Sequence, residues 1–353
     1  MLRNASKVGW RWQASATTYW LTISIIAGVP LAFSTAVYNI YSLPKFAVLL
    51  TGAAALVPLL IWTIVRSYRQ NREAGRLAAS KHVLFVSLYA LVISISTAFG
   101  VSPVAELFGS TDNRTGLITH LCFYVVFVSL IVATARSEKR LRSALWAMTL
   151  TGLVVSTYAY AQFFGRDPFL LRHLYTFESE TGIVVRVNST LGHSNYLGNF
   201  LLYVTPLGAG LALASQGRAR RIAFAAAALS TASIVFTGTR GAWLGLLVAI
   251  VVFIAVGTLG RFGKLLEAQR RTIIHRTGIA FVVILVFAGL ISVNPASRST
   301  VLRARSLIED GFTGSGRTIL WRDSLKIVTQ YPVRRGQAIR LCKRSHQTGP
   351  EIL

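Results

Sequence analysis

Charged residues are scarce in this sequence: 14% of its 353 positions are charged, whereas 53% are hydrophobic. So few ionic groups would leave most of the apolar surface of a soluble domain uncovered. Cysteine is rarer still, with Cys122 inside an apolar run and Cys342 near the C-terminal end. Neither a disulfide framework nor a thiolate metal site can be argued from these two residues. The composition therefore excludes an ordinary soluble domain, and lipid is the expected solvent.

Three kinds of motif are missing as well. The sequence has no paired aspartates for a divalent metal, no His and Cys at metal-ligand spacing, and no nucleotide-type glycine loop. We expect no metal and no cofactor, and nothing points to ATP or a nucleotide sugar. The formal net charge of +25 would suit a nucleic-acid partner, but the basic residues fall between apolar runs rather than on one polar face. No nucleic-acid partner is therefore expected.

Nine apolar stretches are long enough to cross a membrane. A spanning helix needs about 20 mainly apolar residues, because about 30 Å of hydrocarbon is crossed at about 1.5 Å per residue. The sequence therefore predicts an all-α fold, a polytopic transmembrane helix bundle of about nine spans in contact with membrane lipids. The predicted spans are 18–38, 43–65, 83–99, 116–135, 143–163, 195–214, 221–237, 241–259 and 277–293.

Lysine and arginine are distributed unevenly between alternate loops. Cytoplasmic loops hold the excess of these residues. Assigning alternate loops to the cytoplasm gives that side twenty of them and the other side six before the C-terminal tail. The six are Lys45, Arg114, Arg166, Arg172, Arg186 and Arg240. The N-terminus is therefore expected inside the cell and the C-terminal tail outside.

The predicted spans divide the chain into five regions. Residues 1–163 form a five-span membrane region, 164–194 an outward loop, 195–293 a four-span core, 294–333 an outward amphipathic segment, and 334–353 an atypical tail. The loop 164–194 carries a density of charged and polar residues found nowhere else outside the cytoplasmic clusters. We expect the functional site at this loop.

Arg240 lies in a hairpin of a few residues between two apolar runs. A guanidinium near hydrocarbon costs about 2.5–3.5 kcal/mol at a helix centre and less near the interface, so it usually has an anionic partner or a function. The flanking glycines Gly238 and Gly241 let a ligand approach the backbone closely. The alternative is an anchor that extends its charge to water.

Arg186 and His193 lie in the segment that leads into the sixth span. Arginine presents two donors in a rigid fork, so two arginines from different loops could clamp a pyrophosphate without a metal. The alternative for Arg186 is an ion pair with Glu178 or Glu180. His193 is a candidate for proton transfer, or it belongs with Ser194 and Asn195 to the helix cap, where Ser194 or Asn195 would be a good N-cap residue.

Arg317 follows a Gly-Ser-Gly turn at 314–316 and precedes a short amphipathic pattern. It could present a third cation from the start of a helix. The alternative is a solvated surface charge.

Three blocks of this sequence resemble the O-antigen ligase and polymerase superfamily, bacterial inner-membrane enzymes with a Wzy-type C-terminal domain. The first runs from Arg186 to Gly198 and has the form T-x-G-x-x-N, the second is Thr237 to Gly245, and the third runs from Gly314 to Val333. The resemblance implies transfer of a glycan from undecaprenyl pyrophosphate to a sugar hydroxyl on the periplasmic face, in lipopolysaccharide biosynthesis. The acceptor would be a lipid A core or another lipid-linked chain.

The resemblance implies that Arg186 and Arg240 clamp the pyrophosphate, and the reasoning from the residues above completes the predicted site. Arg186, Arg240 and Asn195 would bind substrate, and His193 and Arg317 would be catalytic, with no metal. Members of the family normally continue past the third block with further spans and a histidine-bearing loop, so 334–353 is expected to be a truncated or frame-shifted reading. The alternative functions are a multi-span transporter or flippase for an anionic solute or lipid-linked glycan, and an inactive fragment.

Overall fold

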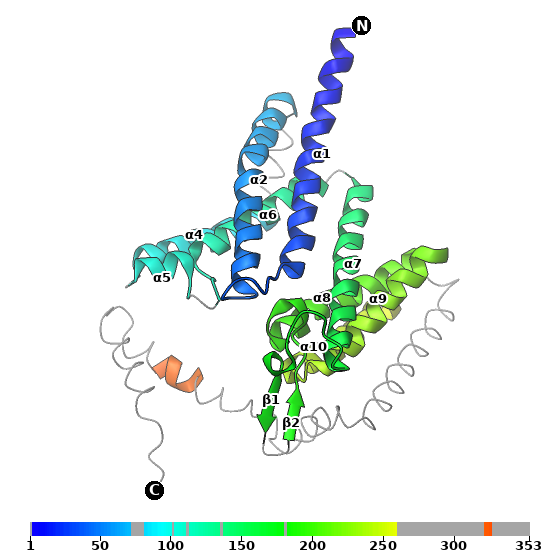
Figure 1. Ribbon diagram of the computed structural model, residues 1–353. Helices are drawn as coiled ribbons and strands as arrows, with labels where there is room; N and C mark the ends of the chain where they lie inside the picture. The colour runs from blue at the N-terminus through cyan, green and yellow to red at the C-terminus, as the bar shows by residue number, and fades with distance from the viewer. Residues whose placement is uncertain are drawn as a thin grey trace.

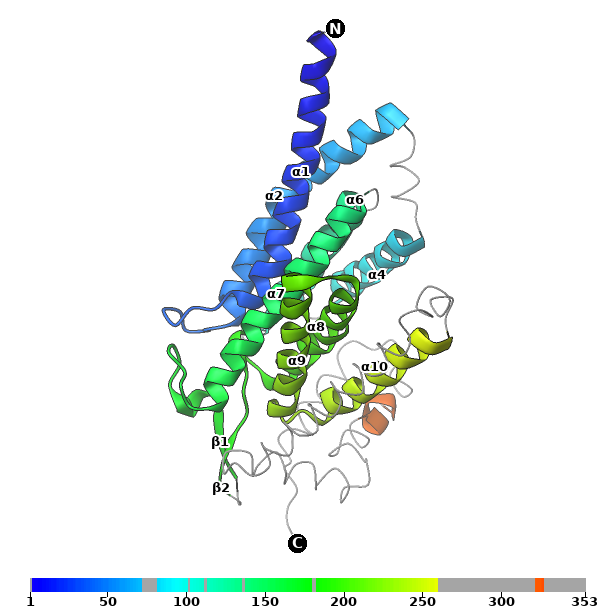
Figure 2. The same cartoon turned by 90° about the vertical axis from the view of Figure 1, so that its right-hand side faces the viewer.

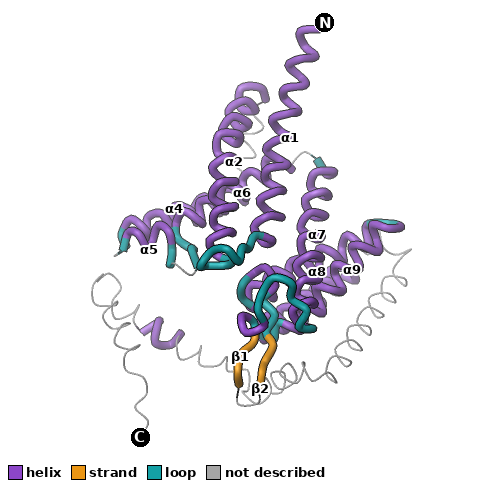
Figure 3. Tube along the Cα trace, in the orientation of Figure 1, coloured by secondary structure: helices purple, strands orange, loops and turns teal. Residues whose placement is uncertain are grey.

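The computed structural model describes residues 2–71, 81–100, 102–110, 113–134, 137–179, 182–259 and 321–326. The regular secondary structure of this part of the chain is helical apart from one short β-hairpin, with loops between the elements (Figures 1 and 3). The longer helices are α1 (Leu2–Leu31), α2 (Ser42–Asn71), α4 (Lys81–Ala98), α6 (Leu117–Thr134), α7 (Glu138–Phe163), α8 (Ser194–Ala214), α9 (Gly217–Phe236) and α10 (Arg240–Leu259). A short helix, α5 (Pro103–Phe108), lies between α4 and α6.

Each of the first eight predicted spans coincides with one of these longer helices. Six of them, α2, α4, α6, α7, α8 and α9, are long and apolar enough to cross a membrane, while α1 and α10 contain shorter apolar stretches. The described chain is thus that of a multi-pass membrane protein. The ninth predicted span, 277–293, lies outside the described residues.

The structure corrects two expectations. The first apolar stretch was predicted to run to residue 38, but α1 ends at Leu31. The chain then forms a closed loop, in which Ser34 N donates to Ile40 O at 2.9 Å and the Asn39 side chain caps the start of α2 by accepting from Ser42 N at 2.8 Å. The all-α expectation also omitted the hairpin of β1 (Thr176–Ser179) and β2 (Gly182–Val185), which pair antiparallel inside the loop 164–194.

Two helical groups make up the bundle. In the first, α1, α2 and α6 pack on one another, with Leu56 fully buried among Ile25, Leu49 and Cys122. In the second, α7, α8, α9 and α10 pack around Val155, Leu197, Leu201 and Ile234. The two groups meet in a buried cluster. Tyr19 and Ile23 of α1 and Ala133 of α6 pack there with Ala144 of α7.

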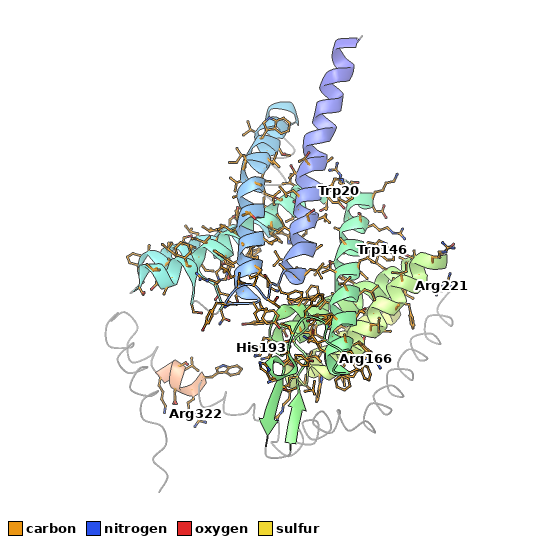
Figure 4. All side chains as sticks on the ribbon, viewed as in Figure 1. Trp20, Trp146, Arg166, His193, Arg221 and Arg322 are labelled. Carbon is orange, nitrogen blue, oxygen red and sulfur yellow. The ribbon has the colours of Figure 1, made fainter. Side chains whose placement is uncertain are left out.

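One end of the molecule gathers segments that are distant in the sequence. The C-terminal ends of α1 and α7, the hairpin and the start of α8 lie together at the end away from the N-terminus (Figures 1 and 2). Figure 4 shows His193 and Arg166 at this end and Arg221 at the far end of α9. The core group of α7, α8, α9 and α10 therefore presents its 164–194 loop at the same end as the α9–α10 turn.

Candidate functional site

The start of α8 is built by His193, which is the N-cap residue of this helix. Its Nδ1 accepts a hydrogen bond from Asn195 N at 3.1 Å. A short 3₁₀ turn, η2 (Ser189–Leu191), precedes it, and Gly192 links the two with a φ of 84°. The structure thus favours the capping alternative for His193, although His193 itself takes the N-cap position that we expected for Ser194 or Asn195.

The α9–α10 turn is short, as the sequence predicted. It consists of Thr237, Gly238 and Thr239, and Gly238 has a φ of 60°. Thr237 is fully buried, and its hydroxyl donates to Ile234 O at 2.7 Å while accepting from Thr239 N at 3.2 Å. A side chain that bonds its own backbone in this way stabilises a turn. The turn therefore holds Thr239 directly before α10, of which Arg240 is the first residue.

Asn195 connects the two predicted motifs. Its Oδ1 accepts a hydrogen bond from Thr239 Oγ1 at 3.1 Å and a long one from Arg186 Nη2 at 3.5 Å. One carboxamide oxygen therefore joins the outward loop, the first turn of α8 and the residue before Arg240. The structure brings Arg186, His193, Asn195 and the start of α10 into one cluster, which we call the arginine junction.

Gly198 allows α8 and α10 to approach this closely. A Cβ at this position would lie 2.8 Å from Ala242 Cβ and 3.4 Å from Thr237 Oγ1. Any larger residue would separate α8 from the start of α10. Gly245, two turns into α10, packs in the same way against Leu202. At Gly241 a Cβ would meet no atom of the described chain within 4 Å, so the backbone beside Arg240 is open on that side.

The charged and partly charged groups that make up the arginine junction are positive. The N-terminal end of a helix carries about half a positive charge and unpaired N–H groups, which favour an anion. Here the N-termini of α8 and α10 meet through Asn195 and Thr239, the guanidinium of Arg186 lies beside Asn195, and Arg240 is the first residue of α10. Both side chains are half-buried. The arrangement is suited to binding a polyanion.

His193 has its basic lone pair engaged. Because Nδ1 accepts from Asn195 N, the neutral ring carries its proton on Nε2. Partial burial, and secondarily the positive charge of Arg186, lower the pKa of His193 below its ordinary value. The ring is therefore neutral at pH 7 and presents an N–H donor, while accepting a proton on Nδ1 would break the cap.

Lys45 supports the junction from α2, a role that the sequence did not indicate. Its Nζ donates to Ala32 O, just past α1, and to Thr190 O in η2, and it lies 5.7 Å from the centre of the Tyr41 ring. Gly192 packs on the same ring, where a Cβ would be 2.5 Å from Tyr41 Cγ. Burial raises the pKa of Tyr41 to about 12, so its hydroxyl is neutral. From sequence, Lys45 was only one of six outward charges, because contacts across about 145 positions leave no local pattern.

Some expected participants cannot be placed. Arg317 lies outside the described residues, as do the side chains of Glu178 and Glu180 that were the alternative partners of Arg186. Residues 321–326 are helical and exposed. In the part of the chain that is described, no group of three or more His, Cys, Asp or Glu side chains lies close enough together to hold a metal.

One comparison with known protein families found a match. Residues 225–340 match the model of the O-antigen ligase family. This match covers less than half of the chain, and it makes that segment similar to the O-antigen ligase family. Arg240 and Arg317 lie within the matched range. Arg186, His193 and Asn195 precede it, and Asn195 contacts Thr239, the residue before Arg240. No curated protein and no solved structure matched the chain in the other two comparisons.

Proposed function

We propose that this protein is a metal-independent glycosyltransferase of the O-antigen ligase or polymerase type in the bacterial inner membrane. The donor is a glycan on undecaprenyl pyrophosphate, and the acceptor is a sugar hydroxyl on a lipid or on another glycan chain. The reaction takes place on the periplasmic face, where the excess of basic residues in the alternate loops places the 164–194 loop. The match to the O-antigen ligase family and the multi-pass helices support this class of enzyme.

One observation carries the proposal: Asn195 Oδ1 joins the loop that holds Arg186 to the residue before Arg240. Two arginines at converging helix N-termini suit pyrophosphate better than a single phosphate or a carboxylate, since each fork can bind two oxygens. Between 186 and 240 the chain makes two helices, and the contacts of Asn195 with Arg186 and Thr239 bring together the segments that carry the two arginines.

The chemistry follows from the leaving group. The bond between the anomeric carbon and the phosphate oxygen breaks while the acceptor oxygen bonds to that carbon, and the proton of the acceptor hydroxyl passes to an oxygen of the departing pyrophosphate. Negative charge grows on the pyrophosphate, and donors already in place stabilise it without reorganisation. Arg186 and Arg240 would hold the two phosphates, and His193 would donate its Nε2 proton in a hydrogen bond to one of them. Arg317 stays the candidate for the acceptor side.

The test uses the purified chain in lipid nanodiscs with a glycan on undecaprenyl pyrophosphate, in the presence of EDTA. Ligase activity gives glycan attached to a lipid A core, and polymerase activity gives a longer lipid-linked chain. Expression in strains that lack either native enzyme separates the same two outcomes in cells. Movement of the lipid-linked glycan between leaflets without transfer would replace this proposal by the transporter alternative. No transfer and no movement would leave the inactive-fragment alternative.

A further inference from the structure

Gln162 is a fully buried polar side chain that the proposed chemistry does not use. It lies in the last turn of α7. Its Oε1 accepts from Ser189 N at 2.7 Å and from Asn188 N at 3.2 Å, and its Nε2 donates to Asp167 Oδ2 at 2.9 Å. A buried amide costs free energy unless it is hydrogen-bonded, so a glutamine that bonds two consecutive backbone N–H groups defines the path of that backbone.

Asp167 determines which way this amide faces. Its Oδ1 accepts from Tyr158 Oη at 2.8 Å and from the backbone N of Phe169 and Leu170, both at 2.9 Å. A carboxylate only accepts hydrogen bonds, so the NH₂ group of Gln162 must face it. The carbonyl oxygen of Gln162 is then left to face residues 188 and 189. Asp167 thus orients the Gln162 side chain, and Gln162 in turn holds the backbone of the turn before α8.

The backbone that Gln162 holds is strained. Ser189 has a φ of 48°, in the left-handed region that residues with a Cβ rarely adopt. Such a conformation persists where the surroundings over-determine it, and it is frequent at functional sites. Here the N–H of Ser189 bonds Gln162, and its hydroxyl donates to Val155 O at 2.7 Å. Without Gln162 the turn would be free to relax.

We propose that Gln162 is a positioning residue, which through the 188–189 backbone sets where Arg186 and His193 stand against α10. Arg186 lies two residues before the held backbone and His193 four residues after it. The expected effect of Gln162 on donor binding rests on the proposed function, whereas its expected effect on the segment 186–193 does not.

The test compares Gln162→Glu with Thr149→Val. The first change keeps the shape of the side chain and places a second carboxylate against Asp167. Tyr158 and Tyr41 are further titratable groups that face Asp167. Thr149 is a matched control, because it is fully buried in the same helix and its hydroxyl has no hydrogen-bond partner in the described part of the chain. Hydrogen exchange on the full chain in nanodiscs is read by mass spectrometry for peptides that cover 186–193, α7 and α8.

In Gln162→Glu at pH 7.5 we expect at least a tenfold faster exchange in 186–193, with α7 and α8 unchanged. Protection should return at pH 5, after correction for intrinsic rates, because a protonated carboxyl can again donate to Asp167. Gln162→Leu should lose the same protection at both pH values. Unchanged exchange at 186–193 in these variants, or equal loss throughout α7 and α8, would overturn the inference.

Transfer assays on the same samples separate the two proposals. If the wild-type chain transfers glycan, Gln162→Glu should raise KM for the donor at pH 7.5 and recover it at pH 5, relative to wild type at each pH. If the wild-type chain transfers nothing while exchange responds as expected, the proposed function fails and the positioning role stands. A purely structural role predicts less folded protein, and hence a lower kcat with KM and its pH dependence unchanged, which would overturn the positioning role.

Discussion

Two arginines lie near opposite ends of α8, and their contacts with that helix differ. Arg142 lies at its C-terminal end, where Nη2 donates to Ala214 O at 3.1 Å and to Ser215 Oγ at 3.2 Å. Arg186 lies at its N-terminal end and reaches Asn195. A cation stabilises the C-terminal end of a helix, where carbonyls are unpaired and the dipole is negative, and is unfavourable at the N-terminal end. Arg142 therefore stabilises the end of α8 that it occupies, whereas Arg186 lies near the end that favours an anion.

The same contrast holds elsewhere in the bundle. Arg140, at the end that Arg142 occupies, donates from Nη1 to Ala133 O at 3.2 Å, close to the C-terminal end of α6. Arg240 instead opens α10. The comparison teaches that an arginine near a membrane interface should be interpreted by which end of a helix it occupies. On this basis the proposed function has Arg186 and Arg240, near two converging N-termini, bind an anion.

The largest expected effect is on sidedness, because the two ends of α8 should lie on opposite faces of the membrane. The 21 residues of α8 span about 30 Å, which is close to the hydrocarbon thickness. Reporter fusions after Gln216 should therefore be cytoplasmic and those after Gly165 periplasmic. Alkaline phosphatase and green fluorescent protein fusions check this in cells. A cytoplasmic reporter at Gly165 would contradict the orientation and, with it, the periplasmic site.

The next effect is on catalysis. Arg240→Lys keeps the charge but loses the bidentate fork, and removing one such donor typically lowers a rate about 100-fold or more. Arg142→Lys is the matched control, since a lysine can still bond the carbonyls at the end of α8. We expect transfer to fall sharply in the first variant only, with equal amounts of both proteins in the membrane. Equal activity of the two would make Arg240 an interface anchor.

A smaller effect is expected at the link between the motifs. Asn195→Asp places a carboxylate where Oδ1 contacts Arg186 and Thr239, so it competes with the substrate for the guanidinium. We expect KM for the donor to rise about tenfold, an effect near 1.4 kcal/mol, with a smaller change in kcat. Asn199→Asp, one turn later in α8 on an exposed position, is the control and should leave KM unchanged. A larger rise in KM for Asn199→Asp than for Asn195→Asp would show that Asn195 is not part of the site.

The smallest effect concerns the cap. Because the pKa of His193 is lowered in the folded protein, the unfolded chain binds more protons around pH 6. The contribution of His193 to stability is present above its unfolded pKa of about 6.5 and is lost as the pH falls through the folded value. An N-cap contributes about 1 kcal/mol, so His193→Ala should lower Tm by about 2 °C at pH 7.5 and by less at pH 5. A larger loss at pH 5 would contradict this account.

The comparison also shows what sequence reasoning could reach. Hydrophobic runs of about 20 residues predicted eight helices to within a few residues at most ends, because the bilayer sets their length. Arg240 was singled out because a charge between apolar runs is costly, and Arg186 because its fork suits phosphate and it lies in the segment that leads into α8. Their role in binding stays a prediction. The early end of α1 and the β-hairpin were missed, since both depend on turns and pairings inside polar or weakly apolar segments.

The residues that position the site could not be predicted from the sequence. Gln162 and Lys45 contact backbone atoms of residues 188–190, and Asp167 acts through the side chain of Gln162. Such contacts have no sequence spacing to recognise. The choice between a capping and a proton-accepting His193 likewise depended on where Nδ1 points. Polar residues buried near a helix end, as Gln162 is, are the one signal that could have drawn attention to this network.

The central claim is that the arginine junction binds pyrophosphate, and direct binding tests it without requiring turnover. Purified protein in nanodiscs would be titrated with undecaprenyl pyrophosphate and with undecaprenol, in the presence of EDTA, and binding followed by native mass spectrometry. The account predicts that the pyrophosphate binds at least tenfold more tightly than the alcohol, and that Arg186→Lys and Arg240→Lys each remove most of that difference while Arg142→Lys leaves it intact. Equal binding of the two lipids, or an equal preference in all three variants, would contradict it.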